Sequence, residues 1–341
     1  MSLDVGKASI RLQDAQGVPI TLPPLLYPAL PAVLNPHVEQ THARALTWAV
    51  TIQLVQPQSK SLVRLNKARL AWVAARLNPD FGLEQLTLFT DWLTWLTCYD
   101  DLCDGDARGH DPAAWGALIQ RLMAVVRNER QPPPTDPLAC ALADLCQRLR
   151  RQTGAGWLDR FAHDLKQAFQ ANRWETAVRA HGAAPDLATY TKMRPLTSAI
   201  APCLDLMALC AGVDPQADWL GHAYLKQLEL LASNHICWVN DLFGLAREIK
   251  ENNQRNLVLV LQQEYQLTLQ TAVDQTVALC NAELKAFFAL AQLFATEEAG
   301  QAADCQRYIH RLQTWLRGNL EWYTETERYQ TKALEPEKLA A

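Results

Sequence analysis

The sequence predicts an all-α fold built as one domain. Three observations support this prediction. Segments with an apolar helical period follow one another from residue 36 onward. Ala, Leu, Gln, Arg and Glu recur throughout, whereas only 14 of the 341 residues are glycine, so the composition favours helix over strand. Runs with β-branched residues, such as 257–261, continue smoothly into helix-like sequence, which leaves strand signals almost absent.

The elements follow from these periods and from the breaks between them. Pro and Leu dominate the first 35 residues without a helical period, so we expect an extended arm there. Helices are expected at 36–55, 60–77, 83–104, 112–128, 137–151, 155–178, 185–213, 216–250, 254–263, 266–295 and 299–333. No break is long enough for an interdomain linker. We therefore predict an arm (1–35) packed on one domain (36–333), followed by a short tail (334–341).

Composition excludes several classes of function. With 32 basic and 36 acidic residues the net charge is −4, which gives no electrostatic reason to expect broad binding to nucleic acid or to an anionic membrane, and we expect no nucleic-acid partner. The longest apolar stretch, 200–213, is interrupted by Asp205, so we expect no membrane span. Nine cysteines occur without a CxxC pair or a secretory segment. We interpret them as reduced thiols of a cytoplasmic protein.

The first candidate site is an acidic cluster that ends an apolar segment. Asp100, Asp101 and Asp104 close the run 91–99. On a helix Asp100 and Asp104 share a face, and Asp101 lies about 100° away. Like charges at the C-terminal end of a helix repel one another and oppose its dipole, and a divalent cation removes that penalty. For this motif alone, a solvated acidic helix end is the alternative.

The second candidate site lies in the last third of the chain. Asn240, Gly244 and Glu248 are spaced i, i+4 and i+8, so they share one face over two helical turns. The preceding segment, 228–239, is largely apolar, which predicts a buried helix whose polar stripe faces a cavity. A hydrogen-bond network between helices is the alternative for this stretch.

The two motifs together resemble those of the bacterial class I terpene synthase family, and most of all its sesquiterpene synthases. An Asp-rich motif followed by Asn-Asp-x-x-Gly-x-x-x-Glu in an all-helical chain is typical of that family. The further landmarks that match the family are Arg194, Arg247, Asn256-Leu257-Val258, Trp322 and Arg328-Tyr329. The resemblance spans roughly residues 35 to 330.

This resemblance implies a class I terpenoid synthase-like helical bundle around a central apolar cavity. It implies an enzyme, a carbon–oxygen lyase, that removes diphosphate from a linear isoprenoid and cyclises the carbocation. The implied cofactor is Mg²⁺, as three ions, with Mn²⁺ as an alternative. The implied metal-binding positions are Asp100, Asp101, Asp104, Asn240, Gly244 and Glu248, where Asp100 would bind two ions and Asn240 and Glu248 the third. The implied diphosphate-binding residues are Arg194, Arg247, Arg328 and Tyr329, and those implied in catalysis are Asp100, Arg194, Arg328 and Tyr329.

The chain departs from the family pattern at several positions. Gly244 replaces the usual Ser or Thr of the second motif, and a water molecule is expected to fill that metal position. Thr197 and Ser198 stand where the family often has Asp and Gly, in a helix break that delivers a backbone carbonyl to the substrate. The expected pocket and effector residues are Leu96, Thr97, Tyr99, Ser198, Cys203 and Trp322.

Farnesyl diphosphate is the expected substrate and a sesquiterpene the expected product. Geranyl and geranylgeranyl diphosphate, for a mono- or diterpene synthase, are the alternatives. A non-catalytic isoprenoid-diphosphate-binding protein is the alternative from another class. A chain-elongating prenyltransferase or a squalene-type synthase would carry a second Asp-rich motif, and a purely structural bundle leaves the polar landmarks unexplained. Analogy alone suggests a homodimer.

Overall fold

The computed structural model describes residues 18–105, 111–152, 155–181, 185–251 and 253–329. Side chains are described throughout these ranges except at 103–105, 155 and 179–181. The helices are α1 (Val38–Thr51), α2 (Lys60–Ala68), α3 (Leu70–Leu77), α4 (Leu83–Gly105), α5 (Pro112–Val126), α6 (Pro137–Gln152), α7 (Ala155–His181), α8 (Leu187–Thr197), α9 (Ile200–Cys210), α10 (Ala223–Lys250), α11 (Leu257–Tyr265), α12 (Leu269–Phe294), α13 (Glu298–Gln301) and α14 (Ala303–Glu325), with a 3₁₀ turn, η2, at Asp218–Gly221.

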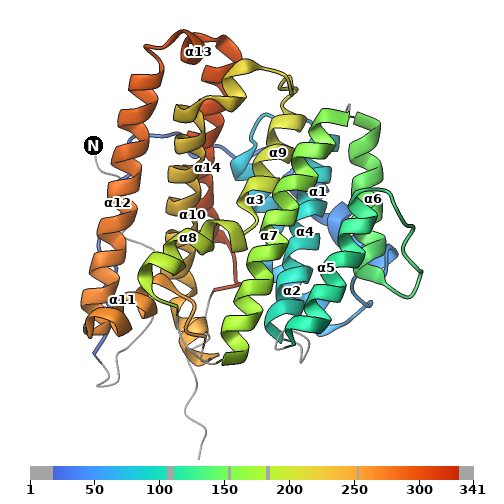
Figure 1. The fold of residues 1–341 in the computed structure, drawn as a ribbon, viewed down its shortest axis with the longest axis horizontal. Coiled ribbons are helices and arrows are strands. Elements are labelled where there is room, and N and C mark those ends of the chain that lie inside the picture. The colour runs from blue at the N-terminus through green and yellow to red at the C-terminus, as the bar shows by residue number, and fades with distance from the viewer. Residues whose placement is uncertain (1–17, 106–110, 153–154, 182–184, 252, 330–341) are drawn as a thin grey trace, which may run out of the picture.

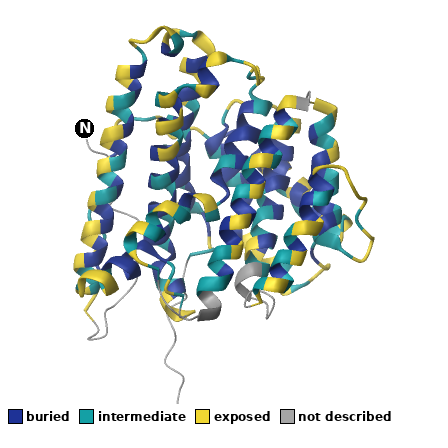
Figure 2. Cartoon of the chain, in the orientation of Figure 1, coloured by how far each residue is buried: buried dark blue, intermediate teal, exposed yellow. Residues whose placement is uncertain are grey.

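The long helices form a bundle around one buried core. In Figure 1, α12 lies at one edge and α6 at the other, with α10, α14, α7 and α4 between them. Helix α10 packs against α12 and α14, α3 packs against α14 and α4, and α7 packs against α8 and α9. Figure 2 shows that the buried faces of these helices point inward. The helices that carry the two predicted motifs, α4 and α10, are thus both central.

Side-chain caps start several of the helices that build the site. Asp186 begins α8 by accepting a hydrogen bond from the Thr189 amide at 2.8 Å. Asn256 begins α11 in the same way, with the Val258 amide at 2.9 Å. Both caps satisfy amides that have no partner inside the helix. These helix starts are therefore local properties of the sequence.

Four of the predicted helices are broken, so the continuous helices expected at 60–77, 185–213, 216–250 and 299–333 are wrong. The third is interrupted at His222, between η2 and α10, and the fourth at Ala302, between α13 and α14; both residues have an extended ψ that ends a helix.

The first two of these helices are broken by left-handed residues. Arg69, with φ 51°, separates α2 from α3, and Ala199, with φ 53°, separates α8 from α9. The first break has a tertiary cause. The Ala68 carbonyl accepts hydrogen bonds from Trp322 Nε1 (3.0 Å) and Thr326 Oγ1 (2.9 Å) instead of continuing a helix ladder. Such distant partners are invisible to a local period.

The last predicted helix also ends earlier than expected. Helix α14 stops at Glu325, and Thr326 is extended, so Arg328 and Tyr329 lie in the turn beyond it rather than in a helix that reaches residue 333. Gly318 lets α14 approach α3 closely, because a Cβ there would lie 2.6 Å from the Arg76 carbonyl oxygen. The segment after α14 lies across the junction of α2 and α3, because Thr326 donates a hydrogen bond to the Ala68 carbonyl there.

The described part of the N-terminal arm, residues 18–35, contacts α12. Leu25 and Tyr27 of the arm are buried. The arm backbone exchanges hydrogen bonds with Gln270 and Asn281 of α12, including Leu26 N to Asn281 Oδ1 at 2.8 Å. The Tyr27 hydroxyl reaches His235 Nε2 on α10. The arm thus contacts two of the long helices.

Helix α12 is, among the described residues, the one helix long and apolar enough to cross a membrane, by length and composition alone. It packs against α10 and α11 and carries Asp274, Glu283 and Lys285. Buried core helices of globular proteins have the same length and composition, so these properties do not by themselves indicate a membrane span.

Candidate active site

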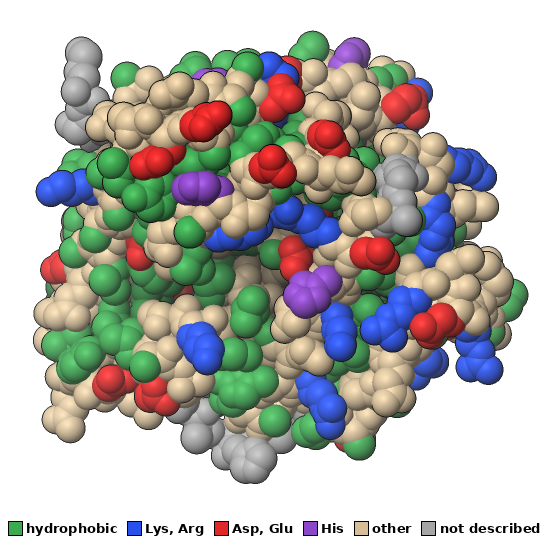
Figure 3. Space-filling model, turned by 45° about the horizontal axis from the view of Figure 1, so that its top comes forward, with side chains coloured by type: hydrophobic (Ala, Val, Ile, Leu, Met, Phe, Trp, Pro, Cys, Tyr) green, Lys and Arg blue, Asp and Glu red, His purple; other side chains and the backbone are tan. Residues whose placement is uncertain are grey.

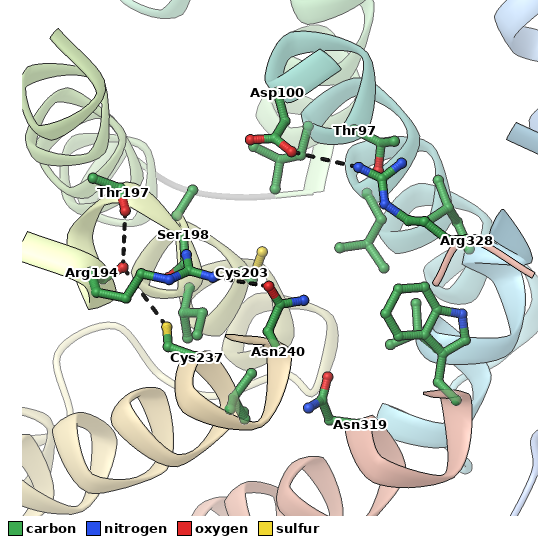
Figure 4. A pocket seen from close by; sticks show the side chains of 18 of the residues that line it. Thr97, Asp100, Arg194, Thr197, Ser198, Cys203, Cys237, Asn240, Asn319 and Arg328 are labelled. Atoms are coloured by element: carbon green, nitrogen blue, oxygen red, sulfur yellow. Dashed lines mark hydrogen bonds and ion pairs between the residues drawn. The ribbon is translucent and has the colours of Figure 1, made fainter. Parts of the chain in front are cut away.

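A cavity of about 280 Å³ opens between α4, α8, α10 and α14. Apolar side chains from α3, α4 and α14, such as Val73, Leu93 and Trp315, form much of its wall. All of the predicted pocket residues line it, namely Leu96, Thr97, Tyr99, Ser198, Cys203 and Trp322. The polar residues among its lining come from α4, α7, α8, α10 and α14, from the segment before α11 and from the turn after α14. The cavity therefore combines an apolar wall with a highly charged region (Figure 4).

Helix α10 contributes the most elaborate polar cluster. The fully buried Asp241 accepts hydrogen bonds from the Tyr190 hydroxyl (2.6 Å), the Leu257 amide (3.0 Å) and Arg194 Nε (3.0 Å). Its carboxylate thus joins α8, α10 and the start of α11. Asp241 does not line the cavity, so it supports the site from behind.

Asn240 faces the cavity and is held from both sides. Its Oδ1 accepts a hydrogen bond from the Arg194 guanidinium at 2.9 Å. Its Nδ2 donates to the hydroxyls of Tyr323 (2.8 Å) and Tyr329 (2.9 Å). Burial would lower the pKa of Arg194, but the Asp241 carboxylate more than offsets this and holds that pKa above its ordinary value. Arg194 is therefore a permanent cation directed at the cavity.

Glu248 lies two turns further along α10 and is buried. Its Oε2 accepts a hydrogen bond from Asn256 Nδ2 at 2.6 Å, and Arg247 lies 3.7 Å from its Oε1. Burial raises the pKa of Glu248 to about 7, and the nearby Asp241 adds to this effect. The carboxylate covers Gly244, where an added Cβ would lie 2.8 Å from Oε1. A bound cation would relieve the penalty of this buried negative charge.

The acidic cluster of α4 lies across the cavity from Asn240. Figure 4 shows Asp100 beside Arg328 on one side and Arg194 beside Asn240 on the other. Arg328 is 3.6 Å from Asp100 Oδ2 and 3.3 Å from Asp101 Oδ1. Asp100 lines the cavity and Asp101 does not. The side chain of Asp104 lies outside the described residues, so its predicted role is not addressed by the structure.

The remaining predicted basic residues also gather here. Arg247, Arg328 and Tyr329 all line the cavity, and the Arg247 guanidinium lies 5.7 Å from the centre of the Tyr329 ring. Burial would lower the pKa of Arg328, but Tyr329 and then the two aspartates of α4 keep it above its ordinary value. The three predicted arginines thus line the same space as Asp100 and Glu248.

Several lining residues were not anticipated from the sequence. Asn172 and Glu175 of α7 line the cavity, as does Arg255, whose Nη1 lies 3.6 Å from Glu175 Oε1. The buried Asn319 of α14 is a further polar residue in the wall. Of these residues, only Arg255 could have been found from the sequence, because it directly precedes Asn256, which belongs to a motif that resembles the family pattern. The α7 residues sit in an ordinary amphipathic pattern without a recognisable motif.

The donors at the cavity fit a hard divalent cation. Carboxylate and amide oxygens are the ligands that Mg²⁺ prefers, and it is commonly bound by one or two carboxylates together with phosphate oxygens. Within the described residues, no group of three His, Cys, Asp or Glu side chains is close enough to hold a metal alone. The acidic groups of α4 and α10 instead face each other across a gap. A ligand that supplies its own oxygens would complete such a site.

Comparison with known proteins decides which family this is. The profile described as "Terpene synthase family 2, C-terminal metal binding" matches residues 91–286. A (+)-T-muurolol synthase from Roseiflexus castenholzii, named as cyclising (2E,6E)-farnesyl diphosphate, is 32% identical over 305 residues, which cover 89% of this chain and 93% of that protein. The chain belongs to the terpene synthase family. A germacrene A synthase from Nostoc punctiforme is 28% identical over 306 residues, covering 90% of this chain and 94% of that one.

Solved structures agree on the fold of this terpene synthase. Wild-type cucumene synthase superposes with a TM-score of 0.75 at 24% identity, covering 87% of this chain and 99% of that one. An α-eudesmol synthase gives a TM-score of 0.74 at 23% identity, covering 87% and 97%. The predicted family and the all-α fold around a central cavity are confirmed. Because the matched profile describes a metal-binding region, use of a divalent metal is a property of the family.

Proposed function

We propose that this terpene synthase ionises farnesyl diphosphate and cyclises the resulting carbocation to a sesquiterpene, with release of pyrophosphate. The observation that carries the proposal is that Asp100 of α4 and the Asn240 and Glu248 side chains of α10 line one cavity together with four arginines and an apolar wall. The choice of substrate is supported by the relative whose name states that it cyclises farnesyl diphosphate.

Magnesium ions, three in number, are the proposed cofactor. Asp100 would hold ions from α4, with Asp101 and Asp104 in support, and Asn240 and Glu248 would hold an ion from α10. When bound, Mg²⁺ neutralises charge on the diphosphate and on the pyrophosphate that leaves. The position of Glu248 supports this assignment, because its carboxylate is buried in the cavity wall, where a bound cation would stabilise its charged form.

The arginines would bind the diphosphate directly. Arg194, Arg247 and Arg328 line the cavity together with Tyr329, so their N–H and O–H groups can donate to phosphate oxygens. Such donors stabilise the negative charge that develops when the C–O bond breaks. Arg194 is already oriented by Asp241, and this lowers the reorganisation needed at that step.

The apolar wall would protect the carbocation. Water close to the cation would convert it to an alcohol, so a dry wall favours cyclisation. Trp315, Trp322 and Tyr323 line the cavity, and aromatic rings can stabilise positive charge.

We further propose that the protein is cytoplasmic and forms a homodimer. The same proposal includes no nucleic-acid partner and no membrane span. Among the described residues, eight cysteines are free thiols. The described residues on the face seen in Figure 3 mix acidic and basic side chains among apolar ones. The mixed surface supports a soluble enzyme. The free thiols support a reducing compartment.

The test is to incubate the purified protein separately with geranyl, farnesyl and geranylgeranyl diphosphate, each with Mg²⁺ and with EDTA. The organic extract is analysed by gas chromatography and mass spectrometry. The expected result is a cyclic C15 product from farnesyl diphosphate that disappears with EDTA. A product from another substrate alone would change the proposed chain length. A folded protein that yields no product from any of them would contradict the proposed activity.

A further inference from the structure

The break between α8 and α9 leaves backbone carbonyl groups that the chain has to satisfy. The Arg194 carbonyl accepts the Ser198 amide at 3.2 Å, and the Leu196 carbonyl accepts the Ala199 amide at 3.2 Å. Those bonds close the last turn of α8. The Thr197 carbonyl is different, because its partner is a side chain from another helix: Asn172 Nδ2 of α7 donates to it at 3.1 Å.

The next carbonyl, that of Ser198, is prevented from joining a helix ladder. In a continuous helix it would accept the amide of the residue four positions on, and that residue is Pro202, which has no N–H. Ala199 is left-handed at this point, with φ 53°. Ser198 itself lines the cavity. The break therefore holds a carbonyl outside the ladder next to the space where a carbocation would form.

Asn172 connects this break to the helix that carries the acidic cluster. Its Oδ1 accepts a hydrogen bond from the Tyr99 hydroxyl at 3.3 Å, and Tyr99 directly precedes Asp100 on α4. A carbonyl oxygen can only accept, so the amide nitrogen of Asn172 must face Thr197 and its oxygen must face Tyr99. Asn172 is buried and lines the cavity. Both polar ends of its amide are thus engaged by different helices.

We propose that Asn172 is a positioning residue that holds the carbonyl groups of the α8–α9 break in place and ties them to α4 through Tyr99. The inference rests on the proposed function, since the break acts on the substrate only if an isoprenoid carbocation forms there. A carbonyl oxygen carries partial negative charge, so its position beside the reacting carbon affects how fast the cation forms and what it becomes. The amide of Asn172 acts through the backbone and does not itself touch the reacting atoms.

The link to α4 gives this arrangement a second consequence. Tyr99 stacks on Trp95 with ring centres 5.4 Å apart, so its ring is fixed by packing while its hydroxyl serves the bond to Asn172. A shift of α4 when Asp100 binds a ligand would reach the break through a chain of two hydrogen bonds. Two specific hydrogen bonds, from Tyr99 to Asn172 and from Asn172 to the Thr197 carbonyl, thus fix the position of the break relative to the acidic cluster.

Three matched variants separate the two bonds. Asn172→Leu removes both bonds with nearly the same side-chain volume. Tyr99→Phe removes only the bond to α4 and keeps the ring in its stack. Asn172→Asp keeps an acceptor for Tyr99 and removes the donor to the Thr197 carbonyl. For each variant, thermal unfolding is measured first, and then kcat, KM and the ratio of cyclic to acyclic products with farnesyl diphosphate and Mg²⁺.

The proposal predicts that Asn172→Leu lowers kcat about 10- to 100-fold, in the range of groups that orient a catalytic element, with KM within about 3-fold of wild type. It also predicts a larger acyclic fraction. Asn172→Asp should follow Asn172→Leu, whereas Tyr99→Phe should lower kcat by only about 3-fold, because the bond to the Thr197 carbonyl survives.

The outcomes distinguish this inference from the proposed function. If the wild-type protein turns over no isoprenoid diphosphate, the proposed function fails and takes the inference with it. If the wild type is active and folded Asn172→Leu keeps its kcat and its product ratio, only the inference is overturned. A drop in thermal stability with unchanged kinetics would likewise assign Asn172 a structural role alone and overturn it.

Discussion

The acidic residues of α4 and of α10, in and behind the cavity wall, are held differently. On α10, Asp241 and Glu248 are buried and their carboxylates are engaged by neighbouring side chains and amides. On α4, the side chains of Asp100 and Asp101 are 55% and 35% exposed, and Arg328 approaches them at 3.6 Å and 3.3 Å. The α10 cluster is organised before any ligand binds. The α4 cluster is poised at a solvent-accessible helix end.

This difference indicates how the work is divided within the site. A preorganised cluster places charge without further reorganisation. Replacing one of its members lowers the stability of the fold, because each buried group depends on the others for hydrogen bonds. An exposed cluster contributes little to stability and can adjust when a cation and a diphosphate arrive. We therefore expect changes in α10 to affect both stability and activity, and changes in α4 to affect activity alone.

The largest expected effect comes from Asp241→Ala. Removing this carboxylate takes away the only anion, among the described residues, that is hydrogen-bonded to the largely buried Arg194 guanidinium, and the closest acceptor of the Tyr190 hydroxyl, which costs about 3–5 kcal/mol of stability. The free energy of unfolding, measured with urea by circular dichroism, should fall accordingly. Asp101→Ala is the matched control and should change it by less than about 0.5 kcal/mol. Equal losses in both variants would erase the contrast between the clusters.

Next in size is the effect of replacing cavity-facing ligands. Glu248→Gln and Asp100→Asn should each lower the rate of pyrophosphate release from farnesyl diphosphate by about 10²- to 10³-fold, because each removes a charge that holds a metal ion. Asp101→Asn should lower it by less than about 10-fold. Full activity in Glu248→Gln would remove α10 from the metal site.

The buried His235 of α10, which the arm contacts through Tyr27, makes the free energy of unfolding depend on pH. Burial lowers the pKa of His235 to about 4, against 6.5 for the exposed side chain. As the pH falls below about 6.5, His235 is protonated in the unfolded chain but stays neutral in the native one. The free energy of unfolding therefore decreases down to about pH 4, by about 3 kcal/mol in total. His235→Gln should remove this part of the pH dependence in urea unfolding at pH 6.5, 5.5 and 4.5. Parallel curves for both proteins would contradict a buried neutral imidazole.

The smallest expected effect concerns Gly244. A Cβ there would meet Glu248 Oε1 at 2.8 Å, the end of a flexible side chain, so either Gly244→Ala or Gly244→Ser forces the carboxylate to turn. Only the serine adds an oxygen that can bind a cation. The Mg²⁺ concentration for half-maximal activity should therefore be about 3-fold lower in Gly244→Ser than in Gly244→Ala. Identical values would show that the position carries no ligand.

The sequence was sufficient for features that depend on neighbours along the chain. The i, i+4, i+8 spacing places Asn240 and Glu248 on one face of a helix, and the structure has both lining the cavity. The helix ladder itself sets such a spacing. The positions of Arg194 and Arg328 beside these clusters came from the family resemblance, since no local rule brings α8 and the C-terminal turn to the same cavity.

The remaining features depend on contacts between distant segments. The break at Arg69 follows from hydrogen bonds donated by the end of α14, more than 250 residues away. Asn172 is an ordinary polar residue of α7 until the fold brings Tyr99 and Thr197 to it. Asp241 is adjacent to a predicted ligand, but its turn away from the cavity is set by Tyr190 and the α11 backbone. No periodicity or propensity contains that information.

A calorimetric titration with inorganic pyrophosphate tests whether Asp100 of α4 and Glu248 of α10 bind a diphosphate together through metal ions. We expect tight binding of pyrophosphate to the wild type in the presence of Mg²⁺, little binding with EDTA, and loss of the Mg²⁺-dependent binding in both Asp100→Asn and Glu248→Gln. Pyrophosphate binding of equal strength with and without Mg²⁺, or unaffected by either substitution, would contradict this expectation.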